Sequence, residues 1–283
     1  MTGPLVAVCW KVVELRAAVD PLTGEVLPDP SSLAASPADE AALEWALRCA
    51  DAAGGRVRVV TAGDAGAEPA LRRAAACGAA ELVRVAMPAG APSEDVARAL
   101  VPELRDAELV WCGDLSRNRG SGSVPAFLAG LLGLPQALGL VAVEIGDEPE
   151  ASGWPIPPLT VTRRLERGRR ERLLVDGRAV LSCEGSVARL RRAPLDRVLA
   201  ASRMPVTLRD GPPAVERPVR AVAVRPYRPA PRVVPPPTGV TASERVRALT
   251  GLSAAPRPAR AVRLDPPAAA RAIVEALESW GEL

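Results

Sequence analysis

Short apolar runs alternate with helical patterns over the first half of the chain, and this order constrains the fold most. The apolar runs have the length of strands, and glycine follows several of the helical segments. Parallel strands need long crossover connections, so this alternation predicts an α/β fold: a parallel sheet with helices on both faces. The predicted strands are 5–9, 57–63, 82–85 and 109–112, and the predicted helices are 36–53, 67–77, 93–104 and 124–132.

The loop after the fourth predicted strand is the strongest candidate for a binding site. It reads Asn118-Arg-Gly-Ser-Gly-Ser123, and Gly120 and Gly122 allow a positive φ and a close approach to a ligand. Successive backbone N–H groups before a helix N-terminus suit a phosphate. The loop has neither a lysine nor a P-loop pattern, so we expect it to hold a nucleotide phosphate rather than transfer one. Alternatively, it is a surface loop in which Ser121 or Ser123 caps the next helix.

Two other segments are expected beside this loop. Ligands on parallel sheets bind at the carboxyl ends of the strands. The first strand is followed by Trp10 and Lys11, and the second ends in Ala62-Gly63. We therefore expect these strand ends and the 118–123 loop to face one pocket.

The composition excludes several kinds of catalytic site. The chain has no histidine, which removes the commonest general base and the commonest metal ligand. Its cysteines are scattered without a C-x-x-C pair, so no metal or redox site is expected. No signal peptide or long apolar run is apparent, so we expect a cytoplasmic protein.

Arginine is distributed unevenly along the chain. The net charge of +3 is too small to predict nucleic-acid binding. Arginines nevertheless crowd residues 163–172 and again residues 189–192. These segments are either solvated faces of strands and turns or a docking face for an acidic partner.

The pattern changes after residue 140. Residues 160–165 and 172–175 predict a hairpin around Gly168, and an apolar strand follows at 179–183. Residues 194–201 predict a short helix or an ordered loop.

The C-terminal part predicts an arm and a final helix. Proline dominates residues 212–237, which favours an extended segment with little core of its own. Asp265 is a good cap for an amphipathic helix, whose apolar stripe needs a surface to cover it. The predicted parts are an α/β nucleotide-binding domain at 1–210, a proline-rich extended arm at 211–264 and a C-terminal amphipathic helix at 265–283.

Several short motifs occur in the order found in one known family. They are Val8-Cys-Trp-Lys-Val-Val13, Val19-Asp-Pro-Leu-Thr-Gly24, Ser36-Pro-Ala-Asp-Glu40, Ala74-Ala-Ala-Cys-Gly-Ala79, Gly133-Leu-Pro-Gln136 and the closing Trp280-Gly-Glu-Leu283. Each motif is weak alone, but together they extend over nearly the whole chain. On these motifs the chain resembles the β subunit of electron transfer flavoproteins.

The resemblance implies a fold like that of the adenine nucleotide α-hydrolases and an electron carrier without catalytic residues. In this family the β subunit forms a heterodimer with an α subunit, FAD lies mainly on α, and β holds a structural AMP. A dehydrogenase donates the electrons, and a membrane-associated acceptor receives them. By position, AMP would contact Cys9, Ser36, Pro37, Ala38, Asp39, Ala62, Ser116, Arg117, Asn118, Arg119, Gly120, Ser121, Gly122, Ser123, Val124, Pro125, Ala126 and Phe127.

The resemblance also implies a contact with the dehydrogenase. In the family, a leucine in a loop anchors that partner, and Leu195 takes the equivalent position here. The chain departs from the family in the nucleotide loop, where D-x-D-x-x-Q is replaced by residues 118–123. Backbone N–H groups, with Arg117 or Arg119, would then contact the phosphate. Among divergent members, the chain looks closest to the group that accompanies the peptide-derived redox cofactor mycofactocin.

Two other classes of protein share parts of this pattern. Gly120-Ser-Gly-Ser-Val124 is similar to the loop of universal stress proteins, although these lack the proline-rich arm and terminal helix. A nucleotide-dependent ligase of the same superfamily needs an S-G-G-x-D-S loop near the first strand. Cys9-Trp10-Lys11 does not provide one.

Overall fold

The computed structural model describes most of the first 212 residues and shorter stretches beyond them. The described residues are 3–146 without 17, 21, 24, 28, 30, 31 and 89, then 153–212, 236–237, 239–250 and 262–280. Contacts divide the chain into two units, 1–226 and 227–283. Each unit is described by itself.

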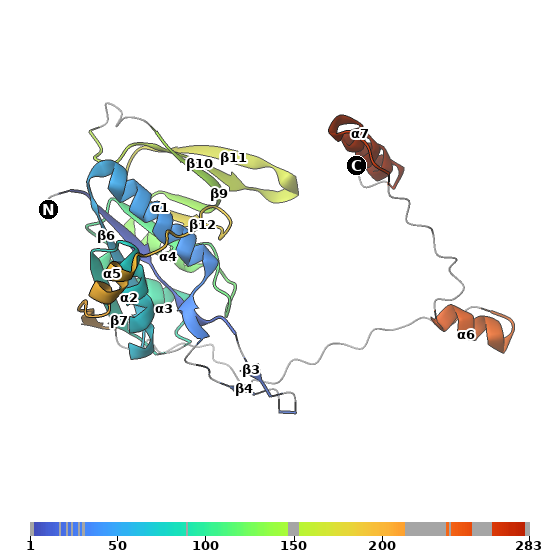
Figure 1. The fold of residues 1–283 in the computed structure, drawn as a ribbon, viewed down its shortest axis with the longest axis horizontal. Helices are drawn as coiled ribbons and strands as arrows, with labels where there is room; N and C mark the ends of the chain where they lie inside the picture. Colours follow the sequence, from blue (N-terminus) through green and yellow to red (C-terminus); the bar gives the residue numbers. More distant parts are fainter. Residues whose placement is uncertain are drawn as a thin grey trace. The chain divides into compact units, whose positions relative to one another are not determined.

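A nine-stranded mixed sheet forms the centre of the first unit (Figure 1). Its strands are β1 (Leu5–Cys9), β6 (Arg56–Gly63), β7 (Glu81–Ala86), β8 (Leu109–Gly113), β9 (Gln136–Ile145), β10 (Leu159–Arg164), β11 (Arg170–Val175), β12 (Ala179–Cys183) and β13 (Thr207–Asp210). They lie in the order β11-β10-β9-β12-β8-β1-β6-β7-β13. Neighbours are parallel except for the antiparallel pairs of β10 with β9 and β11. The predicted α/β fold and the predicted hairpin, β10–β11, are confirmed.

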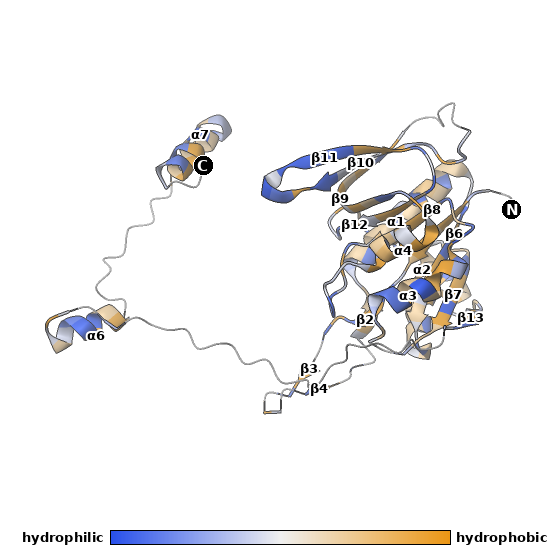
Figure 2. Ribbon diagram, turned by 180° about the vertical axis from the view of Figure 1, so that it is seen from behind, coloured by the Kyte–Doolittle hydropathy of each residue, from blue (hydrophilic) through white to orange (hydrophobic). Residues whose placement is uncertain are grey.

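Helices cover both faces of this sheet. They are α1 (Pro37–Ala53), α2 (Glu68–Cys77), α3 (Ser93–Leu100), α4 (Val124–Leu132) and α5 (Leu195–Ala201), with short 3-10 turns η2 (Ala65–Ala67), η3 (Val101–Glu103) and η4 (Glu166–Gly168). α1 and α2 pack on one face, where Val8 and Leu43 belong to a buried apolar cluster. α3 and α4 pack on the other face, where Ala7 and Leu128 belong to a second cluster. Successive residues of a strand point to opposite faces, so β1 supplies side chains to both clusters. Figure 1 and Figure 2 show the unit from opposite sides.

α1 begins and ends where the sequence predicts. Ser36 is its N-cap, Pro37 is its first residue, and Gly54 follows it with a left-handed φ of 61°. The Ser36 side chain accepts a hydrogen bond from the Asp39 backbone, and the Asp39 carboxylate accepts one from the Ser36 backbone. This reciprocal capping box fixes the direction in which α1 leaves the sheet edge.

Several strands have no clear signal in the sequence. β9 contains Gly139 at a positive φ, and its apolar residues do not alternate strictly with polar ones. Every residue of β13 is exposed, so this edge strand has no apolar face. Two small sheets are also present; they pair β2 (Val12–Glu14) with β5 (Leu33–Ala35) and β3 (Ala18–Val19) with β4 (Val26–Leu27).

The second unit contains two described helices, α6 (Ala242–Thr250) and α7 (Pro266–Ser279). α7 is the predicted terminal helix, and the Asp265 carboxylate caps it by accepting from Ala268 N at 2.8 Å. α6 lies within the range predicted to be an arm. Residues 213–235 and 251–261 of that arm lie outside the described residues. In the described part of the chain, no helix has the length and apolar character of a membrane span.

Trp111 is a central packing residue in a core that consists mainly of alanine, valine and leucine. The chain has only 2% aromatic residues. The Trp111 side chain is fully buried, and its ring stacks on Trp45 with 6.4 Å between the ring centroids. Removing such a ring leaves a cavity that the small neighbouring side chains cannot fill.

We therefore expect Trp111→Ala to lower the free energy of unfolding by about 3–5 kcal/mol. Urea denaturation followed by circular dichroism measures this change. Trp280→Ala is the matched control because the Trp280 side chain is 72% exposed. It should change the free energy of unfolding by less than about 0.5 kcal/mol. Equal losses in the two variants would contradict the packing role of Trp111.

Candidate functional site

A cavity of about 420 Å³ lies at the carboxyl edge of the sheet. This volume falls within the usual range of small-molecule sites. The ends of β1, β6 and β8 contribute to its wall through Trp10, Lys11, Gly63 and the loop that follows β8. The structure therefore brings together the three strand ends that the sequence predicts to face one pocket.

Many of the residues predicted to hold AMP line this cavity. They are Cys9, Asp39, Ala62, Ser116, Asn118, Arg119, Ser121, Gly122, Ser123, Val124 and Pro125. The remaining predicted residues are not in its wall; they are Ser36, Pro37, Ala38, Arg117, Gly120, Ala126 and Phe127. Ser36 to Ala38 nevertheless support the site, because they form the start of α1 that positions Asp39.

The cavity also has a wall that was not predicted. Met87, Pro88, Gly90 and Ala91, which follow β7, face the loop after β8 across the cavity. A signal for them was present in the sequence. β7 is a further parallel strand, and its carboxyl end must lie at the same edge of the sheet.

Asp39 is a buried carboxylate in the wall of the cavity. Its side chain accepts a hydrogen bond from Ser36 Oγ at 2.6 Å and another from the Lys11 backbone at 3.5 Å. Burial raises the pKa of Asp39 to about 6, although these hydrogen bonds favour the charged form. Asp39 belongs to the first turn of α1, so its carboxylate already interacts with the positive N-terminal end of that helix.

Two glycines allow the start of α1 to lie this close to the sheet. A Cβ atom on Gly113, at the end of β8, would lie 3.0 Å from the Asp39 backbone nitrogen. A Cβ atom on Gly185 would lie 2.9 Å from the carbonyl carbon of Pro37. Larger residues at either position would therefore push Asp39 out of the cavity wall.

Lys11 places an ammonium group at the same site. It is the only lysine in the chain, and its Nζ donates a hydrogen bond to Ser116 Oγ at 3.0 Å. Burial, and then the nearby charge of Arg119, lower the pKa of Lys11. An anion beside Nζ would offset both effects.

The loop after β8 has the backbone that its glycines predict. Gly120 and Gly122 both have a positive φ, of 66° and 58°. A Cβ atom on Gly122 would lie 2.3 Å from the carbonyl oxygen of Asp114, so this position requires glycine. Arg119 extends away from the loop and donates hydrogen bonds to the carbonyl oxygens of Ala91 and Gly90, at 2.7 and 3.0 Å. Its guanidinium group therefore joins two loops at the cavity.

The N-terminus of α4 has no capping side chain. Ser123 is its N-cap residue but makes no side-chain capping bond, and the first turn contains no acidic residue. The Ser123 hydroxyl is instead 3.2 Å from the hydroxyl of Ser121. The alternative role of this loop as a simple helix cap therefore does not apply to Ser123. The backbone N–H groups of the first turn, to which Pro125 contributes none, carry a partial positive charge.

Two cysteines lie side by side in the wall of the cavity. Cys9 and Cys112 are paired in the register of β1 and β8. A hydrogen bond to Cys9, together with burial, raises the pKa of Cys112, so its thiol stays protonated and unreactive. Trp10 also borders the cavity, and its buried Nε1 has no hydrogen-bond partner among the described residues.

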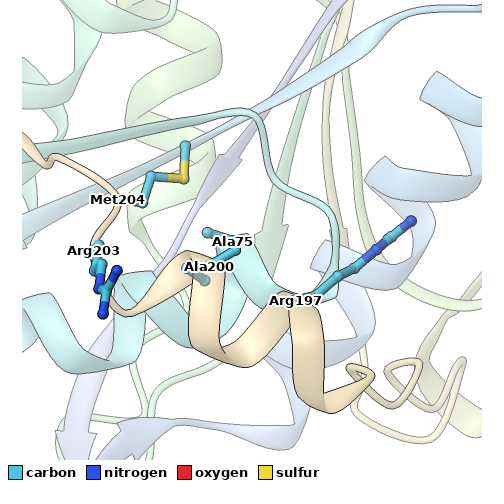
Figure 3. Close-up of a pocket in the computed structure, with 6 residues that line it drawn as sticks. Ala75, Arg197, Ala200, Arg203 and Met204 are labelled. Atoms are coloured by element: carbon cyan, nitrogen blue, oxygen red, sulfur yellow. The ribbon is translucent and has the colours of Figure 1, made fainter.

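Leu195 lies away from this cavity, at the start of α5. Its side chain is 73% exposed, and Val198 and Leu199 on the same helix are also exposed. α5 packs against α2, and a small pocket between them is lined by Ala75, Ala200 and Met204 (Figure 3). The structure therefore presents an apolar helix surface at the predicted docking position.

The model of the electron transfer flavoprotein domain matches residues 31–210. The chain belongs to the electron transfer flavoprotein family. Its similar relatives place it among the beta subunits of that family.

Three relatives carry the name electron transfer flavoprotein subunit beta. The protein of Thermoanaerobacterium thermosaccharolyticum is 33% identical over 155 residues, which are 53% of this chain and 56% of the relative. The Bacillus subtilis protein is 32% identical over 135 residues, or 46% and 52% of the two chains. The Chromohalobacter salexigens protein is 33% identical over 160 residues, or 55% of each chain. The chain thus spans about half the length of the electron transfer flavoprotein relatives it matches.

The raised pKa of Asp39 predicts how stability depends on pH. Between pH 4 and pH 6, the folded protein binds a proton at Asp39 that the unfolded chain has released, so stability should fall as the pH rises through this range. The loss is on the order of 3 kcal/mol. Asp39→Asn cannot titrate and should lack this part of the pH dependence. Urea denaturation of both proteins at several pH values tests this, and parallel stability–pH curves would contradict it.

Proposed function

We propose that this chain is the electron-carrier β subunit of a heterodimer and that its cavity holds AMP with a structural role. The observation that supports a nucleotide is the arrangement of donors at one edge of the sheet. Lys11 Nζ, the uncapped N-terminus of α4 and the glycine-rich loop lie around a single cavity. These groups suit one phosphate, because an ammonium and backbone N–H groups both donate to its oxygens.

The cationic donor differs from the two arginines expected from the sequence. Arg119 is engaged with the carbonyl oxygens of the neighbouring loop, and Arg117 is not in the cavity wall. We infer that Lys11 provides the cationic contact to the phosphate in their place. The strand ends at Cys9 and Ala62 would then serve the nucleoside part.

The heterodimer would carry electrons through FAD bound mainly on the α subunit. This chain would form one wall of the FAD site. Through Leu195, it would also supply the docking surface for a dehydrogenase. A dehydrogenase linked to mycofactocin is the proposed donor, and a membrane-associated acceptor would receive the electrons. In this proposal the described residues of the chain bind the nucleotide and the partners and take no part in electron transfer as acid, base or nucleophile. Membership of the electron transfer flavoprotein family does not favour a universal-stress-protein-like module.

Nucleotide content tests the proposal directly. The chain is co-expressed with its α subunit, the complex is purified and denatured, and the released nucleotides are identified by mass. We expect a yellow 1:1 complex that releases both FAD and AMP. A colourless β chain that stays monomeric beside α would overturn the proposal, and FAD without AMP would overturn its nucleotide part.

Replacing Lys11 tests the phosphate contact. Lys11→Met should lower the affinity of the complex for AMP about 10- to 100-fold, since it removes one charge-assisted hydrogen bond. Isothermal titration of nucleotide-depleted complex with AMP measures this change. Lys11→Arg keeps the positive charge and should lose much less. Equal affinity of the original chain and Lys11→Met would show that the phosphate lies elsewhere.

Replacing Leu195 tests the docking surface. Leu195→Ala should raise the KM of the donor dehydrogenase for the complex about tenfold or more, because an exposed apolar anchor is lost. The turnover number and the FAD content should stay nearly constant. Steady-state reduction of the complex by the dehydrogenase measures both parameters, and Leu131→Ala, on the distant α4, serves as the control. An unchanged KM would exclude Leu195 as an anchor.

A further inference from the structure

A groove of about 780 Å³ lies next to α5, between α2 and the segment that leads into α5. Its wall is rich in arginine and contains a single carboxylate, that of Glu40. The arginines are Arg72, Arg73, Arg189, Arg191 and Arg192. The wall therefore has an excess of positive charge, and it includes Val198 of α5, the helix on which Leu195 and Leu199 are exposed.

The arginines of this groove fall into three groups. Arg72 and Arg73 pair with carboxylates of Glu68 and Glu40. In contrast, the side chains of Arg189 and Arg192 make no hydrogen bond or ion pair with any described residue, and both are exposed. Their charges therefore remain available to a partner.

Arg191 has a different role, because it fixes the segment to α1. Glu44 is only 5% exposed and accepts hydrogen bonds from the backbone nitrogen and the Nε of Arg191, each at 3.0 Å. Arg48 also donates to Glu44, and Arg191 donates to Asp51. Breaking such a buried pair is costly, so residues 189–193 have a defined position. This anchoring leaves the neighbouring Arg189 and Arg192 exposed at the groove.

Positive charge continues on the other side of α5. The small pocket between α2 and α5 is lined by Arg197, which belongs to α5, and by Arg203, which lies in the segment after this helix (Figure 3). Neither side chain makes an ion pair with a described residue. Arginines without an ion-pair partner among the described residues thus line both pockets that α5 borders, and Leu195, Val198 and Leu199 of this helix are exposed.

We propose that the groove and the arginines around α5 bind an acidic segment of the electron donor, with several carboxylates next to an apolar recess for Leu195. This inference rests on the proposed docking role of α5 and adds the chemistry of the partner. Arginine pairs with carboxylates through two parallel hydrogen bonds, which favours a fixed orientation. A single surface pair contributes little, but several of one sign speed association and suppress partners of the wrong charge. A small anion would contact the arginines of the groove or those of the small pocket, but not both sets.

A labelled hexaglutamate peptide tests the groove in the full-length chain. Fluorescence anisotropy at low salt, about 50 mM NaCl, should detect binding that weakens strongly at about 300 mM. The double variant Arg189→Glu/Arg192→Glu should lower the affinity about tenfold or more. The matched control is Arg167→Glu/Arg169→Glu in the β10–β11 hairpin, which makes the same charge change at exposed arginines. It should change the affinity less than about twofold.

Each other result overturns the inference. Equal losses in the two double variants would show a non-specific charge effect. Failure of the peptide to bind, or its displacement by equimolar pyrophosphate, would also exclude a site for an acidic segment. The Leu195→Ala result separates the two proposals: if the KM rises but the peptide does not bind, docking through α5 stands and the acidic groove is wrong. If the KM responds neither to Leu195→Ala nor to Arg189→Glu/Arg192→Glu, both are wrong.

Discussion

The cavity depends on how closely the N-terminus of α1 lies against the end of β8. Gly113 and Gly185 leave no side chain in between, and the capping box of Ser36 and Asp39 satisfies the polar groups at the contact. The cost of this arrangement is a buried carboxylate with a raised pKa. The benefit is that the first helix has its own negative charge at its N-terminus, whereas the N-terminus of α4 stays open across the cavity. One site thus contains two helix ends with opposite electrostatic character.

The same helix, α1, also positions the second functional region. Asp39 in its first turn faces the cavity, and Glu44 little more than a turn later holds Arg191 from the segment before α5. A single helix therefore sets the geometry of the nucleotide site and of the docking segment. Both contacts use buried carboxylates, and burial makes each of them sensitive to the loss of its partner.

Much of the fold could be predicted from the sequence, because the strands of a parallel sheet are short and apolar and the helices between them have clear ends. Ser36, Pro37 and Gly54 predicted the limits of α1. β9 and β13 could not be recognised, since one lacks alternation and the other has no buried face. The three strand ends around the cavity were predictable from topology alone. The engagement of Arg119 with the next loop was not, because only tertiary structure brings Gly90 and Ala91 within reach.

The two outermost strands of the sheet have a consequence for how the protein can associate. β11 carries Arg170, Glu171 and Arg172, and β13 ends in Arg209 and Asp210, so charged side chains flank the outer backbone groups at each border, which pair with no other strand among the described residues. A strand from another molecule would have to bring its backbone between these charges and remove their water. Extension of the sheet into a continuous intermolecular ribbon is therefore disfavoured at both borders. Stable assemblies of this chain should therefore form through its helices and loops. The hydrogen bonds of the sheet then stay unchanged when a partner binds or dissociates.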